Sequence, residues 1–170
     1  MPSSGKTTLA RRLAPSLGLP LIDKDAILEN LFDSRGVGDA AWRRRLSRES
    51  DAIFQAEAKA SAGAILVSFW RLPGMPSDSG TPTGWLTELA GRVVHVHCAC
   101  APEVAGQRFF QRNRHPGHLD GESSHEEALE SLRAVSRLGV LEIGPRVTVD
   151  TSHEPDLAAV LREIQQALAT

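Results

Sequence analysis

Short apolar runs alternate with helical segments along the whole chain, and this alternation limits the fold more than any other feature. The apolar runs lie at residues 20–22, 64–69, 93–98 and 147–149. The composition and spacing between these runs predict helices at residues 7–17, 26–32, 40–62, 85–89, 103–113, 124–138 and 156–168. Strands that alternate with helices indicate an α/β fold with a mostly parallel sheet.

Two local signals define helix ends within this pattern. Gly63 is well placed as the C-terminal stop of the long helix that begins near residue 40. Ser124 and Glu127 have the spacing of a capping box, which predicts a helix start at that point. No internal repeat, linker or low-complexity segment interrupts the pattern. We therefore expect a single domain that covers residues 1–170.

Composition excludes several classes of function. A net charge of -2 over 170 residues gives no electrostatic basis for general nucleic-acid binding or for a membrane surface. No apolar run approaches the roughly 18 residues of a spanning helix, and no signal segment precedes the first helix. Cys98 and Cys100 are too close for an ordinary structural disulfide, so we expect a reduced, cytoplasmic setting. His95 and His97 face away from these cysteines on a strand, which argues against a zinc site.

The residues Ser4, Gly5, Lys6, Thr7 and Thr8 match the second half of a phosphate-binding loop. The full motif is Gly, four residues, then Gly-Lys-Ser/Thr, and its first glycine would fall one position before Met1. In such a loop the backbone amides and the following helix N-terminus hold phosphate oxygens. Lys6 would reach the β- and γ-phosphates, and the Thr7 hydroxyl would bind magnesium. The alternative is a flexible tail with a surface lysine.

Two carboxylates follow the first apolar run, at Asp23 and Asp25. Acidic residues at the carboxyl end of a strand point into the crevice where open α/β sheets bind ligands. A carboxylate at this place can orient an alcohol and accept its proton. Either aspartate could instead cap the helix that begins after the run.

Together with the segments Gln107–His118 and Val149–Ser152, these motifs resemble the P-loop kinases of the adenylate-kinase-like group. The similarity is strongest to small ATP-binding proteins of the AAA_33 type. The resemblance implies a three-layer P-loop sandwich, with ATP and Mg²⁺ as cofactors. It also implies transfer of the γ-phosphate to a hydroxyl of a small molecule. A nucleotide-binding regulatory ATPase without a small acceptor, or an inactive remnant, remains an alternative, and the sequence leaves the acceptor and the oligomeric state open.

The resemblance also implies roles for individual residues. Asp25 would accept the proton of the acceptor hydroxyl, and Asp23 would help Thr7 to hold magnesium. Arg108 and Arg112 are four residues apart, so we expect them to share one helix face and to neutralise the transferring phosphoryl group. They belong to a predicted lid at residues 108–123, in which Arg114 could serve instead.

Three further positions have two interpretations each. Thr151 would lie beside the adenine, or would only lead into the last helix. Trp70 and Arg71 would contact the acceptor, or would be a core residue and a loop charge. No acid follows Val67, where many P-loop enzymes have a magnesium ligand, and Leu28 replaces an arginine of polynucleotide-kinase-like relatives. The leucine weakens the case for a nucleic-acid substrate.

The related proteins begin with a buried strand followed by Gly-x-Pro-Ser-Ser-Gly-Lys-Thr-Thr, and Met1 occupies the position x. The resemblance therefore implies that the first strand, which lies in the middle of the family's sheet, is absent from this chain. We expect that the start codon was assigned at an internal methionine, and the alternative is a truly shortened coding region. Without a central strand the 170-residue form is expected to be poorly stable.

Overall fold

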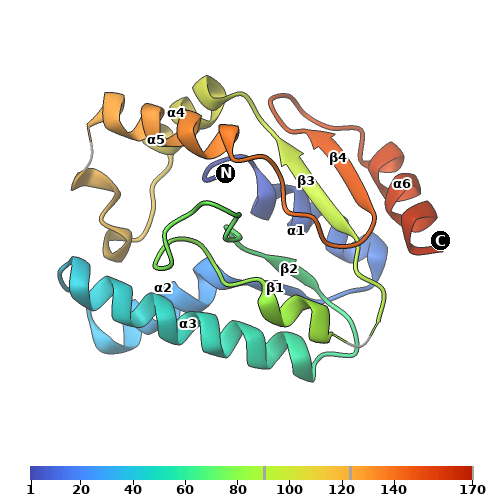
Figure 1. The fold of residues 1–170 in the computed structure, drawn as a ribbon, viewed down its shortest axis with the longest axis horizontal. Coiled ribbons are helices and arrows are strands. Elements are labelled where there is room, and N and C mark those ends of the chain that lie inside the picture. Colours follow the sequence, from blue (N-terminus) through green and yellow to red (C-terminus); the bar gives the residue numbers. More distant parts are fainter. Residues whose placement is uncertain (90, 123, 170) are drawn as a thin grey trace.

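A computed structural model describes residues 1–89, 91–122 and 124–169. Helices and strands alternate in it as the sequence predicts (Figure 1). The helices are α1 (Lys6–Leu17), α2 (Lys24–Arg35), α3 (Ala40–Ala60), α4 (Pro102–Gln111), α5 (His125–Arg137) and α6 (Leu157–Ala169). The strands are β1 (Leu21–Asp23), β2 (Ile65–Val67), β3 (His95–Ala99) and β4 (Arg146–Asp150). Short 3₁₀ turns lie at Gly84–Glu88, Pro116–His118 and Asp120–Glu122.

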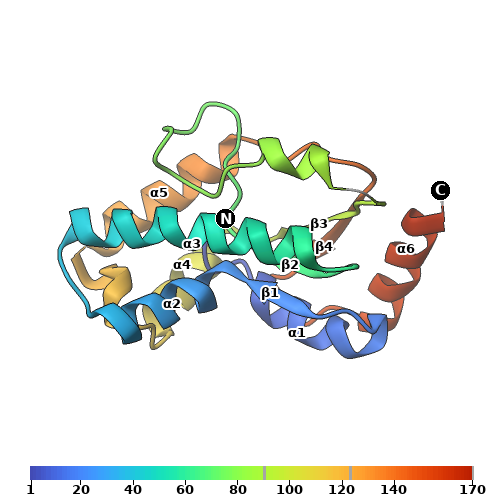
Figure 2. The same ribbon diagram turned by 90° about the horizontal axis from the view of Figure 1, so that it is seen from below.

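The strands form two separate parallel pairs. β1 pairs with β2, with Ile22 opposite Leu66, and β3 pairs with β4, with His97 opposite Thr148. α1 contacts both β1 and β2 and also packs against α6, so it joins the two pairs on one side. α2 and α3 lie side by side at the outer side of β1, whereas α4 and α5 pack together at the other end (Figures 1 and 2). The predicted α/β architecture with parallel strands is confirmed.

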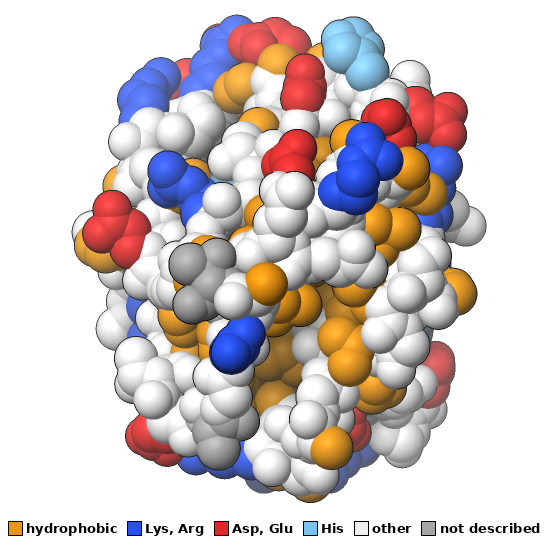
Figure 3. Space-filling view, turned by 90° about the vertical axis from the view of Figure 1, so that its right-hand side faces the viewer, with side chains coloured by type: hydrophobic (Ala, Val, Ile, Leu, Met, Phe, Trp, Pro, Cys, Tyr) orange, Lys and Arg blue, Asp and Glu red, His pale blue; other side chains and the backbone are white. Residues whose placement is uncertain are grey.

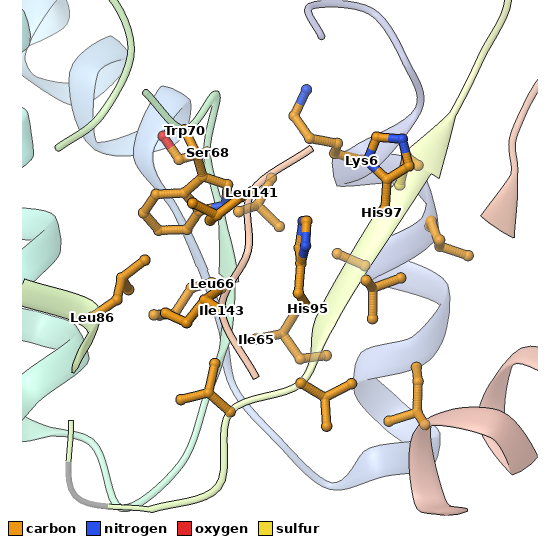
Figure 4. Close-up of a pocket in the computed structure, with 18 of the residues that line it drawn as sticks. Lys6, Ile65, Leu66, Ser68, Trp70, Leu86, His95, His97, Leu141 and Ile143 are labelled. Carbon is orange, nitrogen blue, oxygen red and sulfur yellow. The ribbon is translucent and has the colours of Figure 1, made fainter. Parts of the chain in front are cut away.

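An apolar cleft separates the two strand pairs. No described residue forms a strand between β2 and β3, and a cavity of about 610 Å³ occupies that space. Ile65 and Leu66 of β2 line one wall, and His95 and His97 of β3 line the other (Figure 4). Ile143 also lines the cavity and lies near Leu66 in this view. Figure 3 shows the opening as a hollow lined with hydrophobic side chains. Within the described residues, no strand therefore joins the two pairs.

Three apolar clusters hold the elements together. The first joins α1, β3, β4 and α6 through buried residues that include Leu9, Leu13 and Val149. The second lies between α2 and α3, and the third packs Phe54 of α3 against Trp85 beneath β2. Ile65 of β2 also packs against the first cluster, so apolar contacts connect the two sides of the cleft.

Several predicted boundaries differ from the structure. Gly63 does not end α3, because Ser61 takes the C-cap position and its hydroxyl donates to the Gly63 carbonyl at 2.7 Å. The predicted strand at 64–69 shrinks to three residues, since β2 has only the three-residue β1 as a neighbour. The capping box of Ser124 and Glu127 is confirmed. The described residues include no helix long and apolar enough to cross a membrane.

Candidate functional site

The glycine-lysine segment forms a tight turn at the start of α1. Gly5 has a φ of 81°, a left-handed conformation that favours glycine, and α1 begins at the next residue. The first amide that bonds back into the helix is that of Leu9, which donates to the Gly5 carbonyl at 2.9 Å. The preceding amides of the first turn therefore remain available to an anion. They open onto a cavity of about 1140 Å³, which Thr8 and Lys6 also line.

Lys6 is a partly buried cation without an anionic partner in the described residues. Its ammonium donates to the Met1 carbonyl at 2.6 Å, and no ion pair involves it in the described part of the chain. Burial lowers the pKa of Lys6, while Asp25 and Asp23 oppose this effect through their charges. Ser4 is buried beside it and donates to the same carbonyl at 3.0 Å. A bound phosphate would supply the negatively charged partner that this ammonium lacks.

Thr7 and Asp23 form a hydroxyl–carboxylate pair at the rim of the same cavity. The Thr7 hydroxyl donates to one Asp23 oxygen at 3.0 Å, and the other oxygen caps α2 by accepting the Asp25 amide at 3.0 Å. Asp23 therefore caps α2 and also lies in the candidate site. Burial raises the pKa of Asp23, as expected for a carboxylate that lacks a cation within bonding distance. Hydroxyl and carboxylate oxygens are the ligand types that Mg²⁺ prefers.

No larger metal-binding cluster accompanies this pair. Within residues 1–89, 91–122 and 124–169 no three His, Cys, Asp or Glu side chains are grouped to hold a metal ion. A magnesium ion at Thr7 and Asp23 would therefore complete its coordination with oxygens of water and of a bound phosphate ligand.

Asp25 lies across the cavity in an ion pair with Arg114. Burial opposes the ionisation of Asp25, but Arg114 and His118 outweigh it and hold the pKa of this carboxyl below its usual range. Asp25 is therefore an ionised carboxylate in the cavity that Lys6 also lines. It has the charge required to accept a proton, once Arg114 moves aside.

The two arginines of the predicted lid point to different ends of the cavity, so the expectation that they share one helix face is wrong. Arg108 donates to the carbonyls of Thr151 at 2.7 Å and Ser152 at 3.1 Å. Arg112 is the C-cap of α4 and donates to Asp120 at 2.8 Å. α4 ends before Arg112, so the spacing of four residues does not place the two guanidinium groups together. Ser123 of the predicted lid lies outside the described residues.

Thr151 connects the loop to the strands. Its hydroxyl lies 2.7 Å from the Ser4 carbonyl and 2.8 Å from the Ala99 carbonyl, and the residue is buried. The Thr151 Cβ atom would be 3.5 Å from a Cβ added at Gly5, so the two segments are in close contact. Its hydroxyl is thus committed to positioning the loop, and any contact with a base would use other atoms.

Trp70 and Arg71 are not brought to this cavity. The Trp70 ring packs 5.7 Å from Phe54 and 6.3 Å from Trp85, between ring centroids. Arg71 donates to the carbonyls of Ser79 at 2.9 Å and Gly80 at 3.3 Å, and so fixes the loop that follows β2. In this conformation both residues have the structural role rather than the acceptor-binding role.

Arg43 and His118 are two further residues of this region to which the sequence analysis gave no part in phosphate transfer. Arg43 of α3 lines the cavity, and its buried Nε atom has no hydrogen-bond partner in the described residues. Arg43 lies seven residues before the buried Ser50, on the inner face of α3, whereas Arg44 is exposed. His118 is buried and lies 2.9 Å from Glu29 of α2, which fastens the segment after α4 to α2. The two residues are 89 positions apart in the sequence, so no local sequence pattern predicts their contact.

Comparisons with known proteins agree with this geometry. A crystal structure from Chloroflexus aurantiacus J-10-fl, whose assignment as a kinase is itself provisional, is 30% identical with a TM-score of 0.80. The alignment covers 98% of this chain and 94% of that one. The shikimate kinase of Bacteroides thetaiotaomicron is 20% identical with a TM-score of 0.56, over 99% and 94% of the two chains, and shows the same fold. No curated protein matches the sequence significantly.

The sequence also matches a family model directly. The AAA domain family AAA_33 matches residues 1–138, which include the loop, both aspartates and the arginine segment. The chain therefore belongs to the AAA_33 family, among the P-loop kinases of the adenylate-kinase-like group.

Proposed function

We propose that this protein is an ATP- and magnesium-dependent phosphotransferase that moves the γ-phosphate to a hydroxyl of a small molecule. The observation that carries the proposal is the cavity shared by the unpaired Lys6 ammonium, the Thr7–Asp23 pair and the Asp25 carboxylate. The kinase descriptions of the structural neighbours support the same class of reaction.

Each residue has a defined task in this reaction. Lys6 and the first amides of α1 hold the phosphates of ATP, and Asp25 accepts the proton of the acceptor hydroxyl. The hydroxyl oxygen bonds to the γ-phosphorus, while the bond from this phosphorus to the β–γ bridging oxygen breaks. The bridging oxygen keeps the electron pair and leaves with ADP.

Thr7 and Asp23 would hold the magnesium ion, which neutralises phosphate charge when it is bound. Arg108 is at the loop end of the cavity and Arg112 is at the Asp25 end, where it contacts Asp120. The two guanidinium groups therefore counter negative charge from opposite sides of the transferring group.

A regulatory ATPase without a small acceptor is the second candidate, because the ion pair with Arg114 occupies Asp25 in this conformation. The two functions differ in what Asp25 does. In a kinase, Asp25→Asn lowers acceptor-dependent ADP formation by about a hundredfold or more, since a general base contributes about that factor. In a regulatory ATPase, hydrolysis needs no acceptor and the substitution has little effect.

The first test is calorimetric titration of the protein with ATP and magnesium. Wild-type protein is expected to bind, and Lys6→Ala is expected to weaken binding by about tenfold or more, since a charge-assisted contact is lost. Lys59→Ala is the matched control, because Lys59 is a surface lysine paired with Glu88. Equal affinities of the two variants would show that the loop does not hold the phosphates.

A further inference from the structure

Three arginines and two carboxylates meet at the Asp25 end of the cavity. Arg112 pairs with Asp120 at 2.8 Å, and Arg114 pairs with both Asp25 and Asp120. Arg43 reaches the same cluster from α3, and the charges of Asp120 and Asp25 act on it. The Arg43 guanidinium forms no hydrogen bond or ion pair within the described residues.

We propose that the phosphate acceptor is a hydroxy acid, whose carboxylate is bound by Arg43 and Arg112 while its hydroxyl lies at Asp25. This proposal rests on the phosphotransferase function proposed above. It makes Arg43 a residue that determines which acceptors the protein accepts.

Unpaired donors are the first argument. The Nε atoms of Arg43 and Arg112 are both buried, and neither has a partner in the described part of the chain. A buried donor without an acceptor is costly, so a site with two such donors is expected to receive an acceptor from a ligand. Guanidinium groups present paired N–H donors that match the two oxygens of a carboxylate.

Charge is the second argument. Burial, followed by the nearby charge of Arg114, lowers the pKa of both Arg43 and Arg112. Positive charges are therefore crowded here, and a ligand anion would relieve their repulsion. Within this cluster three guanidinium groups face the two carboxylates of Asp25 and Asp120. One positive charge is left over, which matches a carboxylate better than a phosphate monoester of nearly two negative charges.

Position is the third argument. Asp25, Arg43 and Arg112 line the same cavity, and the charge of Asp25 acts on both arginines, so the proposed base and the two unpaired donors belong to one group. An acceptor whose hydroxyl takes the place of Arg114 at Asp25 would have its other end among these arginines. A small molecule that carries both groups can bridge the two points.

The test compares hydroxy acids with neutral partners of similar shape: glycerate with glycerol, gluconate with glucitol, and shikimate with its methyl ester. ADP formation is measured for wild-type protein and for Arg43→Met and Arg44→Met. Arg44 is exposed on the same helix and is the matched control. We expect turnover of at least one acid in preference to its neutral partner. Arg43→Met should lower kcat/KM for that acid about tenfold to a hundredfold, mainly through KM, because a charge-assisted contact is lost.

Preference for a neutral partner, or equal effects of Arg43→Met and Arg44→Met, would overturn the proposal. If no acid is turned over, calorimetry with the same acids in the presence of a non-hydrolysable ATP analogue decides. Binding that Arg43→Met abolishes and Arg44→Met preserves supports the carboxylate site, and its absence overturns it. Failure of the phosphotransferase function itself appears separately, as a lack of ATP binding or as acceptor-independent hydrolysis.

Discussion

The apolar cleft between β2 and β3 predicts that a short apolar extension at Met1 will stabilise the chain. The Met1 amine lies at this cleft, where burial lowers its pKa from 8.0 to about 5. The unfolded chain binds a proton there that the folded chain excludes. Stability is therefore lost as the pH falls from 8 towards 5. One pH unit corresponds to about 1.4 kcal/mol, so the loss is about 1.4 kcal/mol at pH 7 and about 4 kcal/mol near pH 5.

The perturbation joins five apolar residues and one glycine to the Met1 nitrogen. Five residues match the length of β3, which forms one wall of the cleft. Burying five aliphatic side chains contributes about 10 kcal/mol. Ordering the added backbone costs about 8 kcal/mol. With the buried amine converted to an amide, the net gain at pH 7 is about 3 kcal/mol.

Urea unfolding followed by circular dichroism, at pH 7 and pH 5, measures this gain. The control carries an extension of equal length made of Gly and Ser, which removes the amine charge but offers no apolar side chains. We expect the control to recover only about 1.4 kcal/mol at pH 7, and the apolar extension to recover about 3 kcal/mol. If both extensions raise the free energy of unfolding equally, the apolar side chains do not pack in the cleft, and the prediction is refuted.

Three further predictions concern single residues. Burial lowers the pKa of His95 from 6.5, so the folded protein excludes a proton that the unfolded chain binds below about pH 6.5. His95→Gln should therefore lose less unfolding free energy between pH 7 and pH 5.5 than wild type, and an identical loss would contradict this assignment. Thr151→Val removes the hydroxyl that bonds to the Ser4 and Ala99 carbonyls and should cost about 1–3 kcal/mol, measured by urea unfolding. Arg114→Ala removes the ion pair of Asp25, so the rate of ADP formation without an acceptor should increase while the affinity for ATP stays the same. An unchanged rate would contradict a role of Asp25 in activating oxygen nucleophiles.

Local patterns predicted most of the fold and the first half of the site. The leucines at 9, 13 and 17 define α1, and the capping box at Ser124 defines the start of α5. Asp23 ends β1 and Asp25 lies in the first turn of α2, so their place at the carboxyl end of the strand follows from the sequence order alone. These features depend on residues within one turn or one strand, where periodicity and capping rules apply.

The far side of the site depends on tertiary contacts that local rules do not contain. Arg112 lies just beyond the end of α4, and the position of that end separates it from Arg108. Arg43 is the first of three consecutive arginines, and only the packing of α3 decides which one faces inward. The sequence allows Trp70, which follows β2, to contact either a ligand or the core, and its packing against Phe54 is visible only in the structure.

The ion pair between Arg114 and Asp25 connects these two sides of the site. Asp25 has its partner 89 residues away, on the segment that His118 fastens to α2 through Glu29. In this conformation the carboxylate that would activate an alcohol is bonded to a guanidinium, so an acceptor must displace Arg114 before chemistry begins. A neutral alcohol would replace the ion pair by a single hydrogen bond to the carboxylate, and it would bring no negative charge to offset the one that Arg114 loses. A hydroxy acid brings its own negative charge to the arginines as its hydroxyl takes Asp25, so the exchange leaves the cluster balanced. The same contact that blocks Asp25 without an acceptor therefore favours an acceptor with a carboxylate.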